Sequence, residues 1–174
     1  MLNAGDRAPD FDLESDSGGR VRLADFKGRS LVVFFYPKDN TPGCTREAIA
    51  FSEAMAAISA AGASVVGVSK DSVASHVKFR DKYSLKMPLL SDPDRVVHDA
   101  FGAFGEKMMY GKKILGTIRC TFVIDGHGTV TKVFPSVKVD GHAEAVLAVV
   151  DCSSRAPSAE KRPSSKLRPA PSKR

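Results

Sequence analysis

Cysteine is scarce in this sequence. Its 174 residues contain three, an odd number that does not build the disulfide framework of a small secreted domain. The sequence also has no run of about 18 apolar residues, so we expect no transmembrane helix. Its first residues lack the basic and apolar regions of a secretory signal. These absences favour a reducing, cytoplasmic setting, where a cysteine is more often catalytic than structural.

The net positive charge of the chain is confined to its end. The net charge is +6, and residues 153–174 contain seven basic residues and one acidic residue, which account for all of it. This segment is rich in Ser, Pro and Ala, and its one large apolar side chain, Leu167, cannot bury enough surface to offset the entropy of folding. We therefore predict a folded domain over residues 1–152 and a disordered basic tail over residues 153–174.

The hydrophobic pattern of the domain alternates between strands and helices. Residues 31–36 are continuously apolar, which predicts a central strand buried on both faces. A helical pattern with Pro42 at its first position follows and ends near Gly62. Residues 101–117 are rich in glycine and fit no pattern. The remaining predicted segments are strands or extended pieces over 11–13, 21–23, 63–69, 87–90, 118–124 and 129–134, and helices over 72–83, 91–100 and 140–150. This order predicts an α/β fold with a mixed central sheet.

Cys44 falls in the first turn of the helix that follows the central strand. A thiolate is the reactive form of cysteine, and the partial positive charge and unpaired N–H groups of a helix N-terminus favour it. Cys44 also begins the apolar stripe of this helix, so we expect its side chain to point into a pocket. A buried cysteine often serves only to pack. The position after a strand, a proline and a Thr-Pro-Gly turn favours the reactive role here.

Most reactions that proteins carry out with cysteine need a second residue that this sequence does not supply. A thioredoxin-like reductase needs Cys-x-x-Cys, but Glu47 stands three residues after Cys44. A cysteine protease needs a histidine base, and the histidines lie in unrelated places where each is expected to pack or to face solvent: His76, His98, His127 and His142. No Cys and His residues have zinc-ligand spacing, so we expect no metal and no cofactor. A lone activated cysteine suits attack on a weak bond such as that of a peroxide.

The residues around Cys44 resemble the active-site motif of the peroxiredoxins. The Thr-Pro-Gly-Cys-Thr form of the motif resembles the bacterioferritin comigratory protein, or peroxiredoxin Q, branch. The resemblance spans nearly the whole domain and implies a thioredoxin-like fold and reduction of hydrogen peroxide and organic hydroperoxides. The matching segments are Pro37-x-x-x-Thr41-x-x-Cys44, Gly5-Asp6-x-Ala8-Pro9-x-Phe11, Leu89-Leu90-Ser91-Asp92 and Gly116-Thr117-Ile118-Arg119-x-Thr121-Phe122-x-Ile124-Asp125.

This resemblance implies roles for individual residues. Cys44 matches the peroxidatic cysteine, Thr41 offers its hydroxyl to the peroxide and the thiolate, and Pro37 shields the site from water. Arg119 matches the family's arginine, which binds the peroxide oxygens and favours the thiolate. Attack on the peroxide would leave a sulfenic acid at Cys44.

Two further residues complete the expected site. The backbone N–H groups of Gly43 and Cys44 point toward the place where the leaving oxygen becomes negative, as donors in an oxyanion hole do. Glu47 lies one helical turn after Cys44 and is expected to orient Arg119.

The usual partner for recycling is missing. Many members of the branch carry a resolving cysteine five residues after the peroxidatic one, where this sequence has Ile49, or in the next helix, where residues 72–83 contain none. Cys120 follows Arg119 in a strand, so alternation directs it to the opposite face as core packing. Cys152 is either an exposed thiol or a resolving cysteine that reaches the site from a mobile terminus or a second subunit. We therefore predict a one-cysteine cycle completed by thioredoxin, or by glutathione with glutaredoxin.

Two other functions remain open at this point. The first alternative is a peroxide sensor that passes the oxidation of Cys44 to a partner protein. The second alternative is a polyanion-binding protein that acts through residues 153–174, although these residues offer no aromatic side chain for base stacking. We expect a monomer or weak dimer with weak polyanion binding by the tail and no membrane partner.

Overall fold

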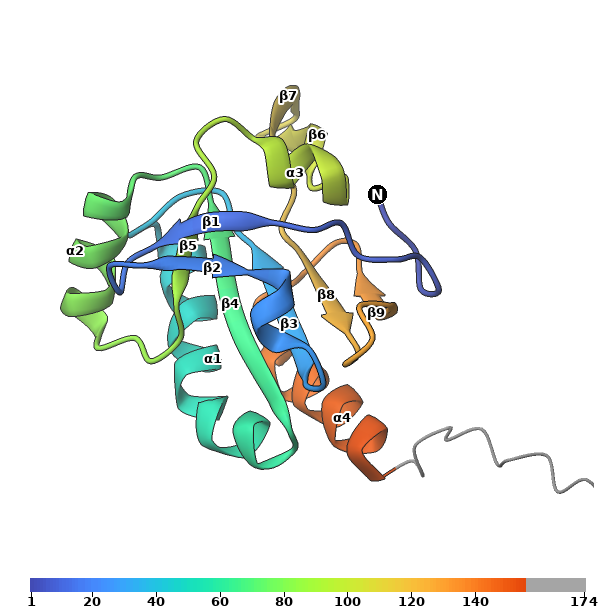
Figure 1. The fold of residues 1–174 in the computed structure, drawn as a ribbon. Helices are drawn as coiled ribbons and strands as arrows, with labels where there is room; N and C mark the ends of the chain where they lie inside the picture. Colours follow the sequence, from blue (N-terminus) through green and yellow to red (C-terminus); the bar gives the residue numbers. More distant parts are fainter. Residues whose placement is uncertain (156–174) are drawn as a thin grey trace, which may run out of the picture.

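A computed structural model describes the backbone of residues 1–155 and the side chains of residues 1–152, and it shows a mixed sheet flanked by helices (Figure 1). The sheet has seven strands in the order β2-β1-β5-β4-β3-β8-β9, of which β3, β4 and β5 are parallel to one another. The α/β fold predicted from the sequence is confirmed. The strands are β1 Asp12–Ser15, β2 Arg20–Arg22, β3 Ser30–Phe35, β4 Ala63–Ser69, β5 Leu89–Ser91, β8 Cys120–Ile124 and β9 Val130–Phe134.

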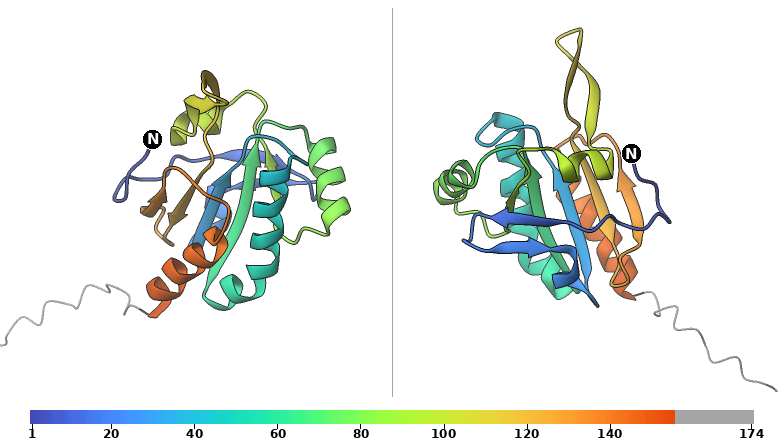
Figure 2. Two further views of the ribbon diagram at one scale, coloured as in Figure 1. Left: turned by 180° about the vertical axis from the view of Figure 1, so that it is seen from behind. Right: turned by 45° about the horizontal axis from the view of Figure 1, so that its top comes forward.

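Helices cover both faces of the sheet because both faces of β3 are apolar. Val32 and Phe34 pack on one face in a core with α1, α2 and α4, whereas Val33 and Phe35 pack on the other face with α3 and the N-terminal segment. Figure 2 shows α1 and α4 side by side behind the strands. The helices are α1 Pro42–Ala60, α2 Val73–Tyr83, α3 Val96–Phe101, α4 His142–Arg155 and the 3₁₀ turn η1 Leu23–Phe26. None of the described helices combines the length and apolar character needed to cross a membrane.

The glycine-rich segment that fits no sequence pattern is a second, two-stranded sheet. Strands β6 Phe104–Met109 and β7 Lys112–Thr117 form an antiparallel hairpin that projects from the body (Figure 2). Tyr110 and Gly111 form its turn with positive φ angles of 51° and 77°. The side chains of this hairpin are mostly exposed or half-buried, so the sequence carries no alternation between apolar and polar residues that would reveal it.

Two helix boundaries differ from the expected ones. Helix α3 begins at Val96 rather than near Ser91, because Ser91 pairs with Ser69 as the last residue of β5. Helix α4 continues to Arg155, three residues beyond the expected domain boundary. The division into residues 1–152 and a disordered tail stays a prediction, since most of that tail lies outside the described residues.

Gly67 provides a test of how tightly the central sheet is packed. It lies in β4 between Phe34 of β3 and Leu89 of β5, and a Cβ atom there would lie 2.7 Å from Phe34 Cζ and 3.1 Å from Leu89 Cδ2. Phe34 stacks on Phe51 with ring centroids 4.6 Å apart, so it has little room to move. We expect Gly67→Ala to lower the free energy of unfolding by about 1–3 kcal/mol in urea titrations.

A matched glycine gives the control for this prediction. Gly19, in the turn between β1 and β2, has no atom within 4 Å of an added Cβ and no positive φ. Gly19→Ala should therefore change stability by less than about 0.5 kcal/mol. Equal effects of the two substitutions would contradict the close packing at Gly67.

Candidate functional site

Cys44 lies where the carboxyl end of β3 leads into α1. Strand β3 ends at Phe35, a loop follows, and Thr41 is the N-cap residue with Pro42 at the first helical position. Proline suits this position because its fixed φ fits the helix and its missing N–H would have no partner there. Cys44 is in the first turn and is 1% exposed. The structure thus places the thiol at a helix N-terminus and against the core, as the sequence predicts.

Arg119 reaches Cys44 from the position just before β8, the strand that neighbours β3. It precedes β8, and the pairing of Phe35 with Cys120 sets it beside the carboxyl end of β3. Its Nη2 donates a hydrogen bond to Cys44 Sγ at 3.2 Å, and its Nη1 donates to Glu47 Oε1 at 3.0 Å. The guanidinium therefore bridges the thiol and the carboxylate.

Gly43 leaves the space that this guanidinium occupies. A Cβ atom at Gly43 would lie 3.3 Å from Arg119 Nη2, so a larger residue would press on the arginine. The structure therefore brings Gly43 together with Cys44, Glu47 and Arg119, all from the predicted set.

Glu47 is a carboxyl group buried at the base of this cluster. It is one helical turn beyond Cys44, and burial raises its pKa from 4.5 to about 7, although the nearby Arg119 partly offsets that effect. Its Oε2 is buried without a hydrogen-bond partner among the described residues. The carboxyl group therefore changes its charge near neutral pH, next to the arginine that contacts the thiol.

Thr41 and Pro37 lie in the loop before the helix but make no described hydrogen bond to Cys44. The Thr41 hydroxyl donates to the backbone carbonyl of Lys38 at 2.9 Å, which holds the loop in a tight turn. Pro37 is half-buried directly after the buried Tyr36. The roles of Thr41 and Pro37 at the site stay predictions.

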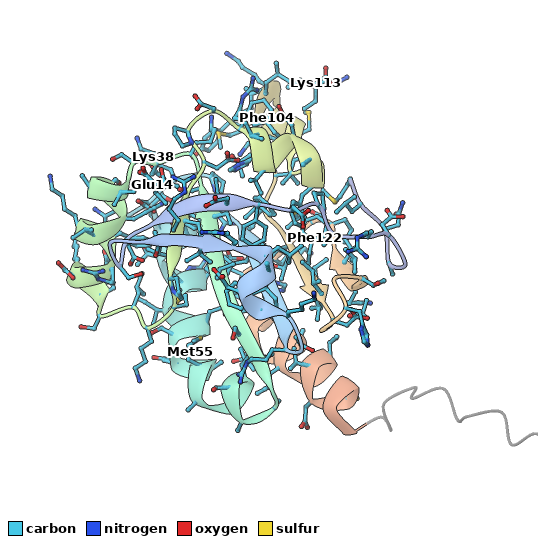
Figure 3. The ribbon with its side chains drawn as sticks, in the orientation of Figure 1. Glu14, Lys38, Met55, Phe104, Lys113 and Phe122 are labelled. Atoms are coloured by element: carbon cyan, nitrogen blue, oxygen red, sulfur yellow. The ribbon has the colours of Figure 1, made fainter. Side chains whose placement is uncertain are left out.

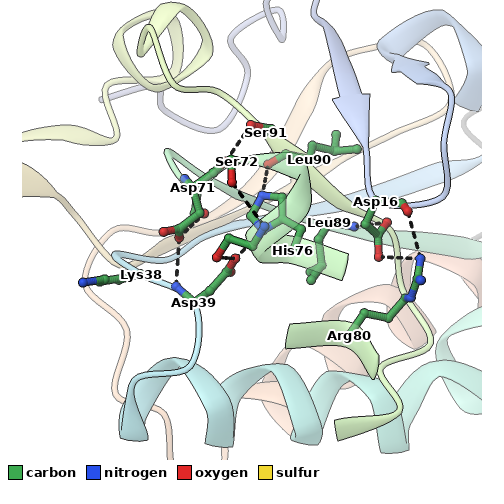
Figure 4. A network of polar contacts seen from close by, with 12 residues as sticks. Asp16, Lys38, Asp39, Asp71, Ser72, His76, Arg80, Leu89, Leu90 and Ser91 are labelled. Atoms are coloured by element: carbon green, nitrogen blue, oxygen red, sulfur yellow. Dashed lines mark hydrogen bonds and ion pairs between the residues drawn. The ribbon is translucent and has the colours of Figure 1, made fainter. Parts of the chain in front are cut away.

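Sequence reasoning missed a polar network that holds this loop in place (Figure 4). Asp39, in the loop, is buried and accepts hydrogen bonds from the Tyr36 hydroxyl at 2.6 Å and the Ser75 hydroxyl at 2.9 Å. Its carboxylate also pairs with His76 Nδ1 at 2.7 Å, and its backbone N–H donates to Asp71 at 2.8 Å. The network ties the loop before Cys44 to α2 and to the end of β4.

The sequence contains a weak sign of this network. An aspartate follows both β3 and β4 at the carboxyl ends of parallel strands, where polar side chains meet. Nothing in the sequence indicates that His76 would be the partner, because it lies 37 residues after Asp39 and inside a different helix.

Each histidine is either buried in the fold or faces solvent, as expected. His76, His98 and His142 are buried and have polar partners, whereas His127 is exposed. Burial, and next the charge of Arg119, lowers the pKa of His142 to about 4, so this ring is neutral at pH 7. None of the described histidines hydrogen-bonds to Cys44, so the thiol has no histidine base.

The other two cysteines lie away from Cys44. Cys120 belongs to the core on the opposite face of the sheet, where burial raises the pKa of its thiol to about 12. It is therefore an unreactive packing residue, as alternation predicts. Cys152 is exposed near the end of α4, and Figures 1 and 2 show that α4 ends at the opposite end of the sheet from the start of α1.

Ile49 stands in α1 where many members of the branch carry a cysteine, and it packs partly buried against the core. Within the part of the chain that the structure describes, no group of three or more His, Cys, Asp or Glu residues is arranged to hold a metal ion. The described site is therefore a single thiol with cationic and N–H donors around it.

Comparisons with known proteins identify the family of the chain. Residues 4–133 match the AhpC/TSA family. The chain is 40% identical over 155 residues to peroxiredoxin Bcp of Bacillus subtilis, covering 88% of this chain and 99% of the relative, and 41% identical over 146 residues to peroxiredoxin Bcp of Escherichia coli, covering 84% and 94%.

Solved structures of related proteins have the same fold as this chain. Peroxiredoxin Q of Xanthomonas campestris superposes with a TM-score of 0.79 at 42% identity, covering 83% of this chain and 92% of the other. A structure of the bacterioferritin comigratory protein from the same organism, described for its alkyl peroxide reduction activity, gives 0.79 at 41% identity with the same coverage. The thioredoxin-like fold of the peroxiredoxins is thereby confirmed.

Substitution of Glu47 tests the electrostatics of the cluster. The folded protein raises the Glu47 pKa from 4.5 to about 7, so the stabilisation from binding this proton is full below about pH 4.5 and is lost as the pH rises through 7. Gln cannot ionise. The stability of Glu47→Gln relative to the wild type should therefore rise between pH 5 and pH 8 in urea titrations.

Glu53→Gln, at an exposed position of the same helix, is the matched control and should show no such trend. If Glu47→Gln instead lost stability relative to the wild type over this pH range, Arg119 would outweigh the cost of burial, and folding would lower the Glu47 pKa instead of raising it.

Proposed function

The chain belongs to the AhpC/TSA family and is a peroxiredoxin, a thiol-dependent peroxidase, and we propose that Cys44 is its peroxidatic cysteine. One observation carries the proposal: Arg119 Nη2 donates a hydrogen bond to Cys44 Sγ across 3.2 Å at a helix N-terminus. A guanidinium and free N–H groups at this position favour the thiolate.

The chemistry of the first half-cycle follows from these contacts. The Cys44 thiolate attacks the terminal oxygen of a hydroperoxide, an S–O bond forms, and the O–O bond breaks. The remaining oxygen leaves as an alkoxide, or as hydroxide from hydrogen peroxide, and takes up a proton to become an alcohol or water. Cys44 has then lost two electrons and carries a sulfenic acid.

The surrounding residues act on the charge that moves during this step. Arg119 and the backbone N–H groups of Gly43 and Cys44 stabilise negative charge as it passes from sulfur to the leaving oxygen. Glu47 holds Arg119 in place through its 3.0 Å hydrogen bond. Under this proposal, Thr41 turns its hydroxyl from the Lys38 carbonyl toward the peroxide when substrate is bound.

Pro37 covers one side of the pocket and keeps water from the sulfur. The substrates proposed are hydrogen peroxide and organic hydroperoxides. The alkyl peroxide reduction activity described for the bacterioferritin comigratory protein of Xanthomonas campestris supports the second class.

For recycling we propose a one-cysteine cycle. Cys120 is buried on the other face of the sheet, and Cys152 lies near the end of α4, away from the start of α1. An external thiol then attacks the sulfenic acid at Cys44 to form a mixed disulfide and water. A second thiol releases Cys44 as a free thiol, with thioredoxin or glutathione with glutaredoxin as the donor.

We also propose that the protein is cytoplasmic and that it is a monomer or a weak dimer. The alternative of weak polyanion binding depends on residues 153–174, most of which lie outside the described residues. The sensor alternative shares the first half-cycle and differs in how many times Cys44 turns over.

Substitutions at the cluster test the proposed roles. Cys44→Ser should abolish peroxide consumption, because Cys120 is buried on the other face of the sheet and Cys152 lies away from the start of α1. Arg119→Met should lower kcat/KM for hydrogen peroxide by about 10²–10³-fold, the usual cost of removing one donor to a developing anion. Arg46→Met is the control. It removes an exposed arginine from α1, the helix that carries Cys44, and should retain full activity.

Steady-state assays with excess reductant make these measurements and also separate the enzyme from the sensor. Many turnovers per Cys44 are expected for the enzyme. A single turnover would favour the sensor, and undiminished activity of Cys44→Ser would remove Cys44 from the proposed role.

Mass spectrometry tests the one-cysteine cycle. After one equivalent of hydrogen peroxide, we expect one added oxygen on the peptide that contains Cys44 and no disulfide to Cys152. Cys152→Ser should recycle at the wild-type rate with an external thiol. A Cys44–Cys152 disulfide, within one chain or between two, would overturn the one-cysteine cycle while leaving the peroxidatic role of Cys44 in place.

A further inference from the structure

We propose that the hairpin β6–β7 is the docking surface for a protein dithiol that reduces the oxidised Cys44, and that this partner presents an apolar patch with an acidic rim. The proposal rests on the function proposed above, because it names the partner for the second half of that cycle. It selects a protein reductant over a small free thiol.

The hairpin carries most of the large apolar side chains that the described residues expose. Six such side chains are exposed, and four of them lie here: Met108 at 64%, Met109 at 43%, Tyr110 at 97% and Leu115 at 70%. Apolar groups gathered on one element mark interaction surfaces in soluble proteins, and exposed methionines are common where a surface must adapt to a partner.

The register of the hairpin places two of these residues, Met108 and Leu115, on one open face. Met108 pairs with Lys113 and Glu106 pairs with Leu115, so these four side chains share one face, and all four are exposed. The two-stranded sheet has no third strand among the described residues and buries little of its own surface. A face that presents two large apolar side chains, Met108 and Leu115, and that no described part of the fold covers is available to another protein.

The base of the hairpin adjoins the proposed peroxide site. Strand β7 leads through Ile118 to Arg119, which contacts Cys44. The Lys107 ammonium, on the inner face, donates to the Thr117 carbonyl at 2.9 Å. Burial, and next the charge of Arg119, lowers the pKa of Lys107. Figure 3 places Phe104 and Lys113 of the hairpin at the same end of the molecule as Lys38, in the loop before the site.

The charge of this region defines the partner. Lys107, Lys112 and Lys113 lie on the hairpin with one acidic residue, Glu106, and the Phe104 ring at its base has the Lys70 ammonium and the Arg95 guanidinium over its faces, 5.1 Å and 4.2 Å from the centroid. The surface is therefore apolar with a cationic rim.

An acidic protein complements this surface and approaches it faster for that reason. A second copy of this chain would bring the same cations against it. The basic tail has the same sign of charge and does not complement the hairpin either.

The need for a docked protein follows from the burial of the sulfur. Cys44 is 1% exposed, so a thiol meets its sulfenic acid only after the start of α1 opens locally. A bound partner keeps its thiol at high effective concentration during such openings. The partner's first thiol attacks Cys44 sulfur, an S–S bond forms, and the sulfenic oxygen leaves as water. The partner's second thiol then displaces Cys44, and the partner, having given up two electrons, leaves with an internal disulfide.

The experiment uses two hairpin variants of the full chain, Met108→Ser/Leu115→Ser and Lys113→Glu. Peroxide turnover is measured with thioredoxin, its reductase and NADPH, with glutaredoxin and glutathione, and with dithiothreitol. With the protein that supports wild-type turnover, we expect each variant to lower kcat/KM for that protein by about tenfold or more, as loss of an interface anchor does. With dithiothreitol we expect no change.

Val96→Ser, which removes an exposed apolar residue from α3, is the matched control and should behave as the wild type. The wild-type rate with the protein reductant should also fall as salt is added, because the cationic rim steers association.

Other outcomes would overturn the proposal. Equal losses with dithiothreitol would make the hairpin part of the peroxide site. Unchanged rates in both variants, or no turnover with either protein reductant, would remove it as a docking surface. Loss of a dimer in sedimentation would assign the face to a second copy, and binding to phosphatidylglycerol vesicles that the variants lose would assign it to a membrane surface.

If Cys44 is not the peroxidatic cysteine, the experiment gives a different result. Wild-type protein that forms no sulfenic acid in a single turnover with hydrogen peroxide would disprove the proposed role of Cys44, whatever the hairpin variants do. The variants should form sulfenic acid at the wild-type rate, because neither one alters a residue of the peroxide site.

Discussion

The pairing of β3 with β8 is the constraint on which the site depends. The chain reaches Cys44 a few residues after β3 ends, and it reaches Arg119 one residue before β8 begins. These residues are 75 positions apart, and only the match of Phe35 with Cys120 brings the guanidinium to the thiol. A slip by one residue would turn the side chains of β8 to the opposite face, so the register that packs the cores on both faces of the sheet also fixes the chemistry.

The cluster at Cys44 is polar in a place where the fold would otherwise be apolar. Cys44 belongs to a core cluster that contains aromatic residues, Glu47 beside it is buried, and one oxygen of that carboxylate is left without a described partner. Burying such groups costs free energy that their mutual contacts only partly return. The Asp39–His76 network beside them is well satisfied by hydrogen bonds. It holds the loop so that the start of α1 keeps its position despite that cost.

What the sequence could predict depends on whether the signal was local. The strand, the proline at the helix start and the place of Cys44 are properties of neighbouring residues, and they were predicted. Arg119 came only from the resemblance to the peroxiredoxins, because no short-range pattern links it to Cys44. The link between Asp39 and His76 could not be predicted for the same reason. The hairpin β6–β7 was missed because it faces solvent, where the alternation that identifies strands has no core to produce it.

Ile49 has a consequence for the kinetics of the proposed cycle. With an aliphatic side chain where a second thiol often stands, the reduction of Cys44 becomes a bimolecular step. The lifetime of the sulfenic acid is then set by the concentration of another molecule and not by the fold. When that molecule runs short, the same oxidised sulfur stays available to further peroxide and can pass to the irreversible sulfinic state. With one apolar residue at this position of α1, how long the enzyme stays active depends on the concentration of its reductant.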